Sequence, residues 1–216
     1  MYNHSSGLGW VSLEPVKLFW LTKACRFDII DLSTANRRRT MNKVHKERYF
    51  NGQLKERSTW KDDKRDGLTE KWYENGQCKE RSDYKNGKRD GLTEEWFENG
   101  QKMKRRNYKA GKQNGLSEKW YLNGQPKERA NYKNGKLEGP LEWWHENGKI
   151  WYRVNYKDGN LDGLYEEWHD NGQIKVRETY KNGNLNGLSQ WWTKDGQLIV
   201  RDNYKNGIRI SRYIYT

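Results

Sequence analysis

Large aliphatic side chains are scarce in this sequence. Leu, Ile, Val and Phe together make up 35 of 216 residues, and the net charge is +13. Such a composition usually belongs to a disordered chain. The 12 Trp and 14 Tyr argue against disorder, because each aromatic side chain buries roughly 150–250 Å². An aromatic, aliphatic-poor core suits a single sheet better than a thick two-layer domain.

Cysteine is also rare, and long apolar stretches are missing. Cys25 and Cys78 provide neither a disulfide framework nor the spacing of zinc ligands. No apolar run approaches the ~18 residues that a membrane-spanning helix needs. We therefore expect a protein of a reducing compartment, with a cytoplasmic location.

Three glycine-containing turn signals recur with a period of 24 residues. The first is Asn-Gly at Asn51, Asn75, Asn99, Asn123, Asn147 and Asn171, and Asp-Gly at Asp195. The second ends on Gly87, Gly111, Gly135, Gly159, Gly183 and Gly207, and the third on Gly67, Gly91, Gly115, Gly139, Gly163 and Gly187. This period predicts seven repeats in 43–210, a degenerate one at 43–66 and full ones at 67–90, 91–114, 115–138, 139–162, 163–186 and 187–210, with a tail at 211–216.

Other residue types keep the same period and form columns. One column is Trp72, Trp96, Trp120, Trp144, Trp168 and Trp192, and another is Trp60, Tyr84, Tyr108, Tyr132, Tyr156, Tyr180 and Tyr204, each followed by Lys. Arginine recurs from Arg57 to Arg201, and glutamate from Glu70 to Glu166 with Gln190 in the sixth place. We expect the Trp and Tyr columns to supply the packing between neighbouring repeats.

Asn-Gly between two short aromatic segments is typical of a β-hairpin with a two-residue type I′ turn. Such a turn at Asn75-Gly76 would place Glu74 opposite Gln77, Trp72 opposite Lys79, and Glu70 opposite Arg81. The last pairing would recur as a charge ladder that fixes the strand register: Glu70–Arg81, Glu94–Arg105, Glu118–Arg129, Glu142–Arg153 and Glu166–Arg177. The predicted fold is all-β, with tandem 24-residue hairpins forming an elongated, single-sheet antiparallel array.

The repeat unit resembles a known family. The segment from Gly67 to Gln77, followed by Tyr84-Lys85-Asn86-Gly87-Lys88, is similar to the MORN repeat, in particular to its bacterial and viral variant. The resemblance covers about 45–210 and implies hairpin repeats with a scaffolding or binding role. Many bacterial members carry an antitoxin label, and some eukaryotic members are tied to membranes and phosphoinositides. This chain lacks the Gly-x-Gly pair of the usual pattern, which weakens the transfer of lipid binding.

The first 42 residues share nothing with the repeat. Lys17 and Lys23 interrupt the apolar stretch around Leu18-Phe19-Trp20-Leu21, whereas a signal peptide needs a basic start and an unbroken apolar run. We expect a short segment that caps the first hairpin. The alternatives are an exported chain and an upstream extension before a true start at Met41, with Arg37-Arg38-Arg39 as a weak anion-binding signal.

No pattern in the sequence predicts catalysis. The carboxylates recur once per repeat opposite an arginine, which makes them structural, and the glycines mark turns and do not open helices. His145 and His169 occupy equivalent places in adjacent repeats, which is compatible with a metal site, but Tyr73, Phe97 and Tyr121 fill the same place elsewhere. We therefore expect no catalytic residue, no metal and no cofactor.

The aromatic residues that break the repeat pattern are the candidates for partner contact. Trp143, Trp151, Tyr152, Tyr165 and Trp191 stand where other repeats mostly carry polar residues. An exposed aromatic patch would mark a surface that binds another protein, and packing between repeats is the alternative.

The lysine column could instead bind anionic membrane, and the basic aromatic surface could bind nucleic acid. Open edge strands also favour self-association.

Overall fold

The computed structural model describes residues 42–216, which contain strands and turns and no helix. The interpretations of the N-terminal segment concern residues that, apart from Asn42, lie outside this range. The fifteen strands are β1 (Lys43–Arg48), β2 (Leu54–Lys61), β3 (Lys64–Trp72), β4 (Cys78–Lys85), β5 (Lys88–Trp96), β6 (Lys102–Lys109), β7 (Lys112–Trp120), β8 (Pro126–Lys133), β9 (Lys136–Trp144), β10 (Ile150–Lys157), β11 (Asn160–Trp168), β12 (Ile174–Lys181), β13 (Asn184–Trp192), β14 (Leu198–Lys205) and β15 (Ile208–Ile214).

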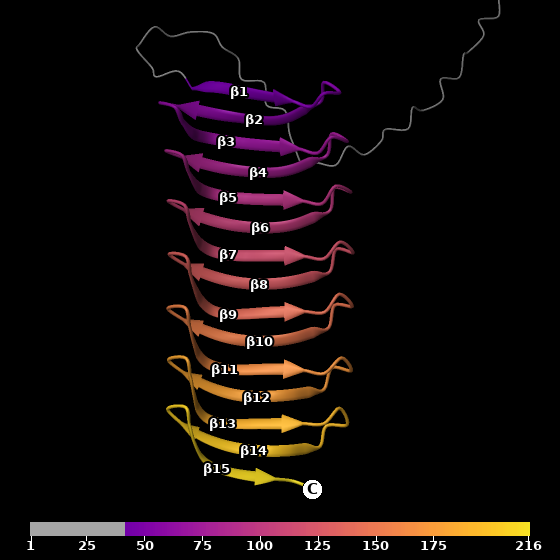
Figure 1. Ribbon diagram of the computed structural model, residues 1–216, viewed down its shortest axis with the longest axis vertical. Coiled ribbons are helices and arrows are strands. Elements are labelled where there is room, and N and C mark those ends of the chain that lie inside the picture. The colour runs from indigo at the N-terminus through magenta and orange to yellow at the C-terminus, as the bar shows by residue number, and fades with distance from the viewer. Residues whose placement is uncertain (1–41) are drawn as a thin grey trace, which may run out of the picture. The chain divides into compact units, whose positions relative to one another are not determined.

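All fifteen strands form one sheet in sequence order, and each strand pairs antiparallel with the next (Figure 1). Turns at the two ends of the strands alternate along the chain, so each 24-residue repeat contributes two strands. The predicted all-β array of tandem hairpins is thereby confirmed. Because residues 42–216 form a single sheet, each of their repeats packs within this range only against its sequence neighbours.

The turns that follow the even-numbered strands are two-residue type I′ turns. Asn86 and Gly87 have φ values of 50° and 79°, and Lys85 pairs with Lys88 across the turn. Both central residues of a type I′ turn need positive φ, which Asn and Gly tolerate. The Gly87 amide also donates to the Arg65 carbonyl at 2.8 Å, and the Asn86 amide donates to Asp66 Oδ2 at 3.1 Å. The turn at Asn86-Gly87 is therefore hydrogen-bonded to the start of β3.

The prediction of a two-residue turn at Asn75-Gly76 was wrong. The Tyr73 amide donates to the Gln77 carbonyl at 2.8 Å, and the Gly76 amide donates to the Tyr73 carbonyl at 2.9 Å. This is a three-residue loop, a type I turn followed by a left-handed glycine. Asn75 has no positive φ, as a type I turn requires, and its side-chain oxygen accepts the Gln77 amide at 2.9 Å. Trp72 consequently pairs with Cys78 and not with Lys79.

A column of turn-side aromatics also ties neighbouring repeats together at this end of the strands. The Tyr73 hydroxyl donates to the Trp96 carbonyl, and the Tyr121 hydroxyl donates to the Trp144 carbonyl, both at 2.8 Å. His169 takes the same place, with Nε2 lying 3.0 Å from the Trp192 carbonyl. Tyrosine and His169 therefore occupy the same repeat position because each side chain bonds to the carbonyl of a tryptophan in the next repeat.

The third glycine column marks a bulge inside each odd-numbered strand from β3 to β13. Ser82 pairs with Thr93 and Tyr84 pairs with Arg89, so a step of two residues in β4 matches a step of four in β5. Gly91 lies in the extra segment with a φ of 121°, a conformation that is essentially restricted to glycine. Strands with such bulges bend and twist more strongly than regular strands.

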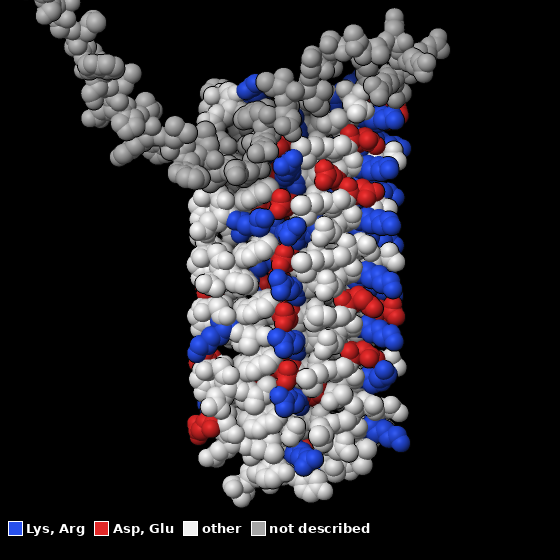
Figure 2. All heavy atoms as spheres, turned by 180° about the vertical axis from the view of Figure 1, so that it is seen from behind, with Lys and Arg blue, Asp and Glu red and all other residues white. Residues whose placement is uncertain are grey.

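One face of the sheet, which we call the ladder face, carries the alternating Arg and Glu columns. Figure 2 shows this alternation as a central column of basic and acidic side chains. Glu70 lies opposite Arg57 on one side and Arg81 on the other. Its ion pair forms with Arg57, whereas Glu94 pairs with Lys102 at 2.8 Å and Arg105 with Glu118 at 3.8 Å. The expected pairs form at Glu118–Arg129 (3.1 Å), Glu142–Arg153 (2.8 Å) and Glu166–Arg177 (2.8 Å).

The opposite face, which we call the tyrosine face, carries the Tyr column and a row of small or apolar residues. Ser58, Thr69, Ser82, Thr93, Ser117 and Ala130 are buried in this row. Toward the C-terminus the row continues with Leu141 and Val154, which form a core cluster with Ala130. The tryptophan column lies on the ladder face, where Arg153 and Arg177 sit 6.0 Å from the rings of Trp168 and Trp192.

Candidate functional site: an aromatic cavity on the tyrosine face

The tyrosine face is charged and internally paired in the N-terminal repeats. Glu80 binds Lys71 at 3.0 Å and Arg89 at 2.5 Å, and Ser82 donates to it at 2.8 Å. Burial by itself opposes ionisation of Glu80, but these hydrogen bonds and the two positive charges lower its pKa to about 2. The guanidinium of Arg65 pairs with Glu56 at 2.7 Å and lies 5.6 Å from the Trp60 ring and 5.5 Å from the Tyr84 ring. This part of the face satisfies its own charges.

The same face becomes aromatic in the C-terminal repeats. Trp143 stacks on Tyr152 at a centroid distance of 6.0 Å, and Tyr152 stacks on Tyr165 at 6.3 Å. Tyr165 in turn meets the edge of Tyr180 at 6.4 Å. These rings come from β9, β10, β11 and β12, and the surface that they form continues from the cluster of Ala130, Leu141 and Val154. A continuous aromatic surface thus replaces the ion pairs of the earlier repeats.

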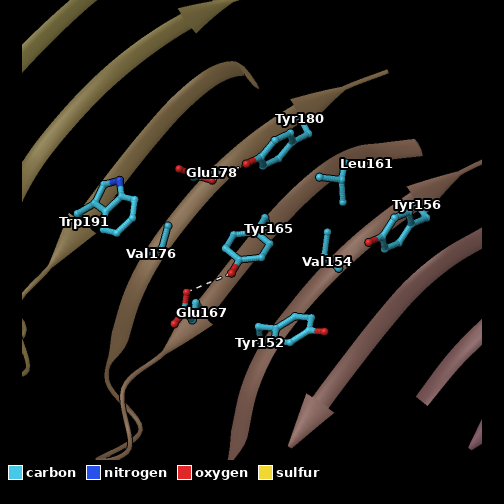
Figure 3. Close-up of a pocket in the computed structure, with 10 residues that line it drawn as sticks. All are labelled: Tyr152, Val154, Tyr156, Leu161, Tyr165, Glu167, Val176, Glu178, Tyr180 and Trp191. Atoms are coloured by element: carbon cyan, nitrogen blue, oxygen red, sulfur yellow. Dashed lines mark hydrogen bonds between the residues drawn. The ribbon is translucent and has the colours of Figure 1, made fainter. Parts of the chain in front are cut away.

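An open cavity of about 420 Å³ lies within this aromatic surface, a size within the range of small-molecule or side-chain pockets. Its lining comes from β10 to β13 and consists of Tyr152, Val154, Tyr156, Leu161, Tyr165, Glu167, Val176, Glu178, Tyr180 and Trp191. Figure 3 shows Tyr165 near the centre with Glu167 and Val176 beside it, Trp191 on one side, and Tyr156 and Leu161 on the other. The cavity therefore combines aromatic walls with two carboxylates.

The two carboxylates have different partners. Glu167 accepts from the Tyr165 hydroxyl at 3.1 Å (Figure 3) and from Lys175 at 2.7 Å. Glu178 is buried and accepts from the Tyr180 hydroxyl at 2.7 Å and from Ser189 at 3.0 Å. Within residues 42–216, Glu178 forms no ion pair with Lys or Arg. Its negative charge is therefore held by two neutral hydroxyl groups.

Three tyrosine hydroxyls in the cavity, those of Tyr152, Tyr165 and Tyr180, stay protonated. Burial raises the pKa of Tyr152 to about 12. Burial, together with the neighbouring carboxylates Glu167 and Glu178, also raises the pKa values of Tyr165 and Tyr180. The Tyr165 and Tyr180 hydroxyls therefore act as hydrogen-bond donors to Glu167 and Glu178 at neutral pH.

The structure brings all five predicted contact residues together on one surface. Tyr152, Tyr165 and Trp191 line the cavity, and Trp143 extends the stack from Tyr152. Trp151 does not line the cavity, but its ring lies 5.5 Å from His145 and meets Trp143 edge-on at 6.3 Å. Trp191 and Trp151 are 43% and 39% exposed, so both tryptophans present aromatic surface to solvent.

The prediction from sequence missed both carboxylates in the cavity, Glu167 and Glu178, and part of its apolar lining. Glu178 stands at the repeat position of Ser58 and Ser82, and Leu161 stands at that of Arg65 and Arg89. Comparison of repeat columns shows both departures, since each changes the charge at its position. Their significance depends on neighbours from other strands, which a single repeat does not show.

The two histidines that were considered as metal ligands, His145 and His169, lie in structural positions. Among residues 42–216, no group of three His, Cys, Asp or Glu side chains is arranged to hold a metal ion. His145 packs on Trp151 and His169 binds the Trp192 carbonyl, so both fill the turn-side aromatic column. No helix that could span a membrane occurs in this part of the chain.

Comparison with known proteins identifies the repeat. The search of curated proteins gave no match. The family model described as MORN repeat variant matches seven consecutive segments, at 41–62, 65–86, 89–110, 113–134, 137–158, 161–182 and 185–206. The chain therefore belongs to the MORN repeat variant family, whose repeats build scaffolds for binding proteins or membranes.

Proposed function

We propose that this chain is a non-enzymatic scaffold that binds another protein through the aromatic end of its tyrosine face. The observation that carries the proposal is the change along that face from paired charges to an open aromatic cavity whose lining includes the exposed Trp191. Tryptophan and tyrosine in such pockets dominate binding energy at protein interfaces. An antitoxin-like role would be one instance of this function, with a toxin as the bound protein.

The test is capture of a partner from native lysate by the full-length tagged protein, with nuclease present, at low and high salt. We expect one protein to be retained at high salt. Trp191→Ser should reduce its recovery about tenfold or more, because loss of a central interface aromatic typically costs that much. Phe50→Ser, which removes an exposed aromatic in the β1–β2 turn, should leave recovery unchanged. Equal capture by the wild type and Trp191→Ser would contradict the proposal.

A second candidate function, peripheral binding to anionic membrane, rests on the edge formed by the two-residue turns. Lysines face each other across these turns in four pairs: Lys61–Lys64, Lys85–Lys88, Lys109–Lys112 and Lys133–Lys136. Like charges placed opposite each other destabilise a sheet, so an anionic ligand would relieve the repulsion along this basic edge, which is visible in Figure 2. Recovery of anionic lipid in place of protein, lost as salt rises, would favour this function.

A further inference from the structure

The carboxylate of Glu178 has a close structural counterpart in the next repeat. Asp202 occupies the same position on β14 and is also buried. It binds Arg212 at 2.8 Å and lies 3.8 Å from Arg209. Opposite Glu178, the residue at the position of Arg212 is Ser189, and the strand position of Arg209 is held by Leu185. The two arginines that compensate Asp202 are thus absent from the equivalent positions around Glu178.

The N-terminal repeats show which kind of side chain pairs with a carboxylate that lies beside aromatic rings on this face. Arg65 lies near the rings of Trp60 and Tyr84 and pairs with Glu56. Arg89 lies 5.5 Å from the Tyr108 ring and pairs with Glu80. A guanidinium suits this arrangement because it stacks on aromatic faces, is weakly hydrated and donates to carboxylates in a planar fork. Leu161 replaces this arginine beside the cavity.

We propose that the cavity beside Glu178 receives an arginine side chain of the protein partner, whose guanidinium pairs with Glu178 and stacks against the tyrosine and tryptophan walls. This inference rests on the proposed function, and it names the chemistry of the bound residue. A buried carboxylate without a cationic partner is costly, so an incoming arginine would recover an interaction that the chain itself provides at Glu56, Glu80 and Asp202. The net positive charge of the chain disfavours cationic partners in general, which makes the local carboxylate the source of selectivity.

The test uses two peptides and the full-length protein. One peptide is Gly-Gly-Arg-Gly-Gly with blocked ends, and the other carries citrulline, the neutral isostere of arginine, in the central position. Binding is measured by calorimetric titration. Charged hydrogen bonds of this kind contribute enough that the citrulline peptide should bind about tenfold more weakly or worse. Equal binding of the two peptides, or binding of neither, would overturn the inference.

Two variants and one matched control assign the effect to Glu178. Glu178→Gln should bind both peptides equally weakly, whereas Glu128→Gln should discriminate like the wild type, because Glu128 is buried on the same face but already pairs with Lys119 at 2.7 Å. Ser189→Arg should place an internal arginine opposite Glu178, as Arg212 lies opposite Asp202, and should block the peptide. Unchanged discrimination in Glu178→Gln, with a normal unfolding transition, would also refute the inference. Failure of Trp191→Ser to affect protein capture would refute the proposed function and would leave the peptide result standing.

Discussion

Replacement of Glu80 by glutamine is expected to lower the free energy of unfolding at neutral pH by about 3 kcal/mol. This loss follows from the pKa of Glu80, which is about 2 in the folded chain against an ordinary value of 4.5, since lowering a pKa by one corresponds to about 1.4 kcal/mol. The Glu80 side chain is 12% exposed, so solvent screening of its pairs with Lys71 and Arg89 is small. Its loss leaves both cations without this acceptor.

The pH dependence of this effect has a defined sign. A carboxyl group whose pKa is lowered by folding stabilises the folded state above its unfolded pKa. This contribution disappears as pH falls from about 4.5 to about 2. The stability difference between wild type and Glu80→Gln, measured by urea unfolding, should therefore be full at pH 7 and vanish near the lower limit. Glu98→Gln, an exposed glutamate in the β5–β6 turn, serves as the control. A difference that does not change with pH would contradict the assignment.

Gly91→Ala is expected to produce the second large effect, a loss of about 3 kcal/mol in the free energy of unfolding. Gly91 has a φ of 121° in the bulge of β5, and an added Cβ would lie 3.0 Å from the Asp83 Cβ. Backbone strain and a contact too short for carbon atoms therefore act together. Urea unfolding of the purified variant measures the loss.

Gly124→Ala is the matched control for this prediction. Gly124 has a φ of 85° in the three-residue turn between β7 and β8, and an added Cβ would meet nothing within 4 Å. The expected loss is about 1 kcal/mol, because only the left-handed conformation is penalised. Equal losses in the two variants would show that the bulge relaxes around a new side chain and that the close approach of β4 and β5 is not required.

The strands and the register of the Glu and Arg columns were predictable because their signals are local and repeat. Glu70 lies opposite Arg81, as expected from the column spacing, since a one-residue slip would place these side chains on different faces. The turn at Asn75-Gly76 was not predicted because Asn-Gly fits two loop types. In the longer loop the Asn75 side chain accepts the Gln77 amide, but the same loop forms at Asp195-Gly196, where the Gln197 amide donates to Thr193 Oγ1.

The cavity was only partly predictable. Tyr152, Tyr165 and Trp191 stand out because they depart from the repeat pattern, and all three line it. Glu178 also departs from the serines at its repeat position, but its importance depends on what other residues lack. Its compensation would have to come from the positions of Leu185 and Ser189 on β13, and the room beside it depends on Leu161 of β11. Only the folded sheet shows these residues together.

The most direct test of the proposed binding surface is oxidative footprinting of the full-length protein with and without the captured partner. Hydroxyl-radical oxidation reads the exposure of each aromatic side chain, and Trp191 and Trp151 are exposed in the free chain. We predict that the partner protects Trp191, Trp151 and Tyr165 and leaves Tyr84 and Tyr108 on the N-terminal repeats unchanged. Protection confined to the tryptophan column of the ladder face, with Trp191 still oxidised at its free rate, would contradict binding at the aromatic cavity.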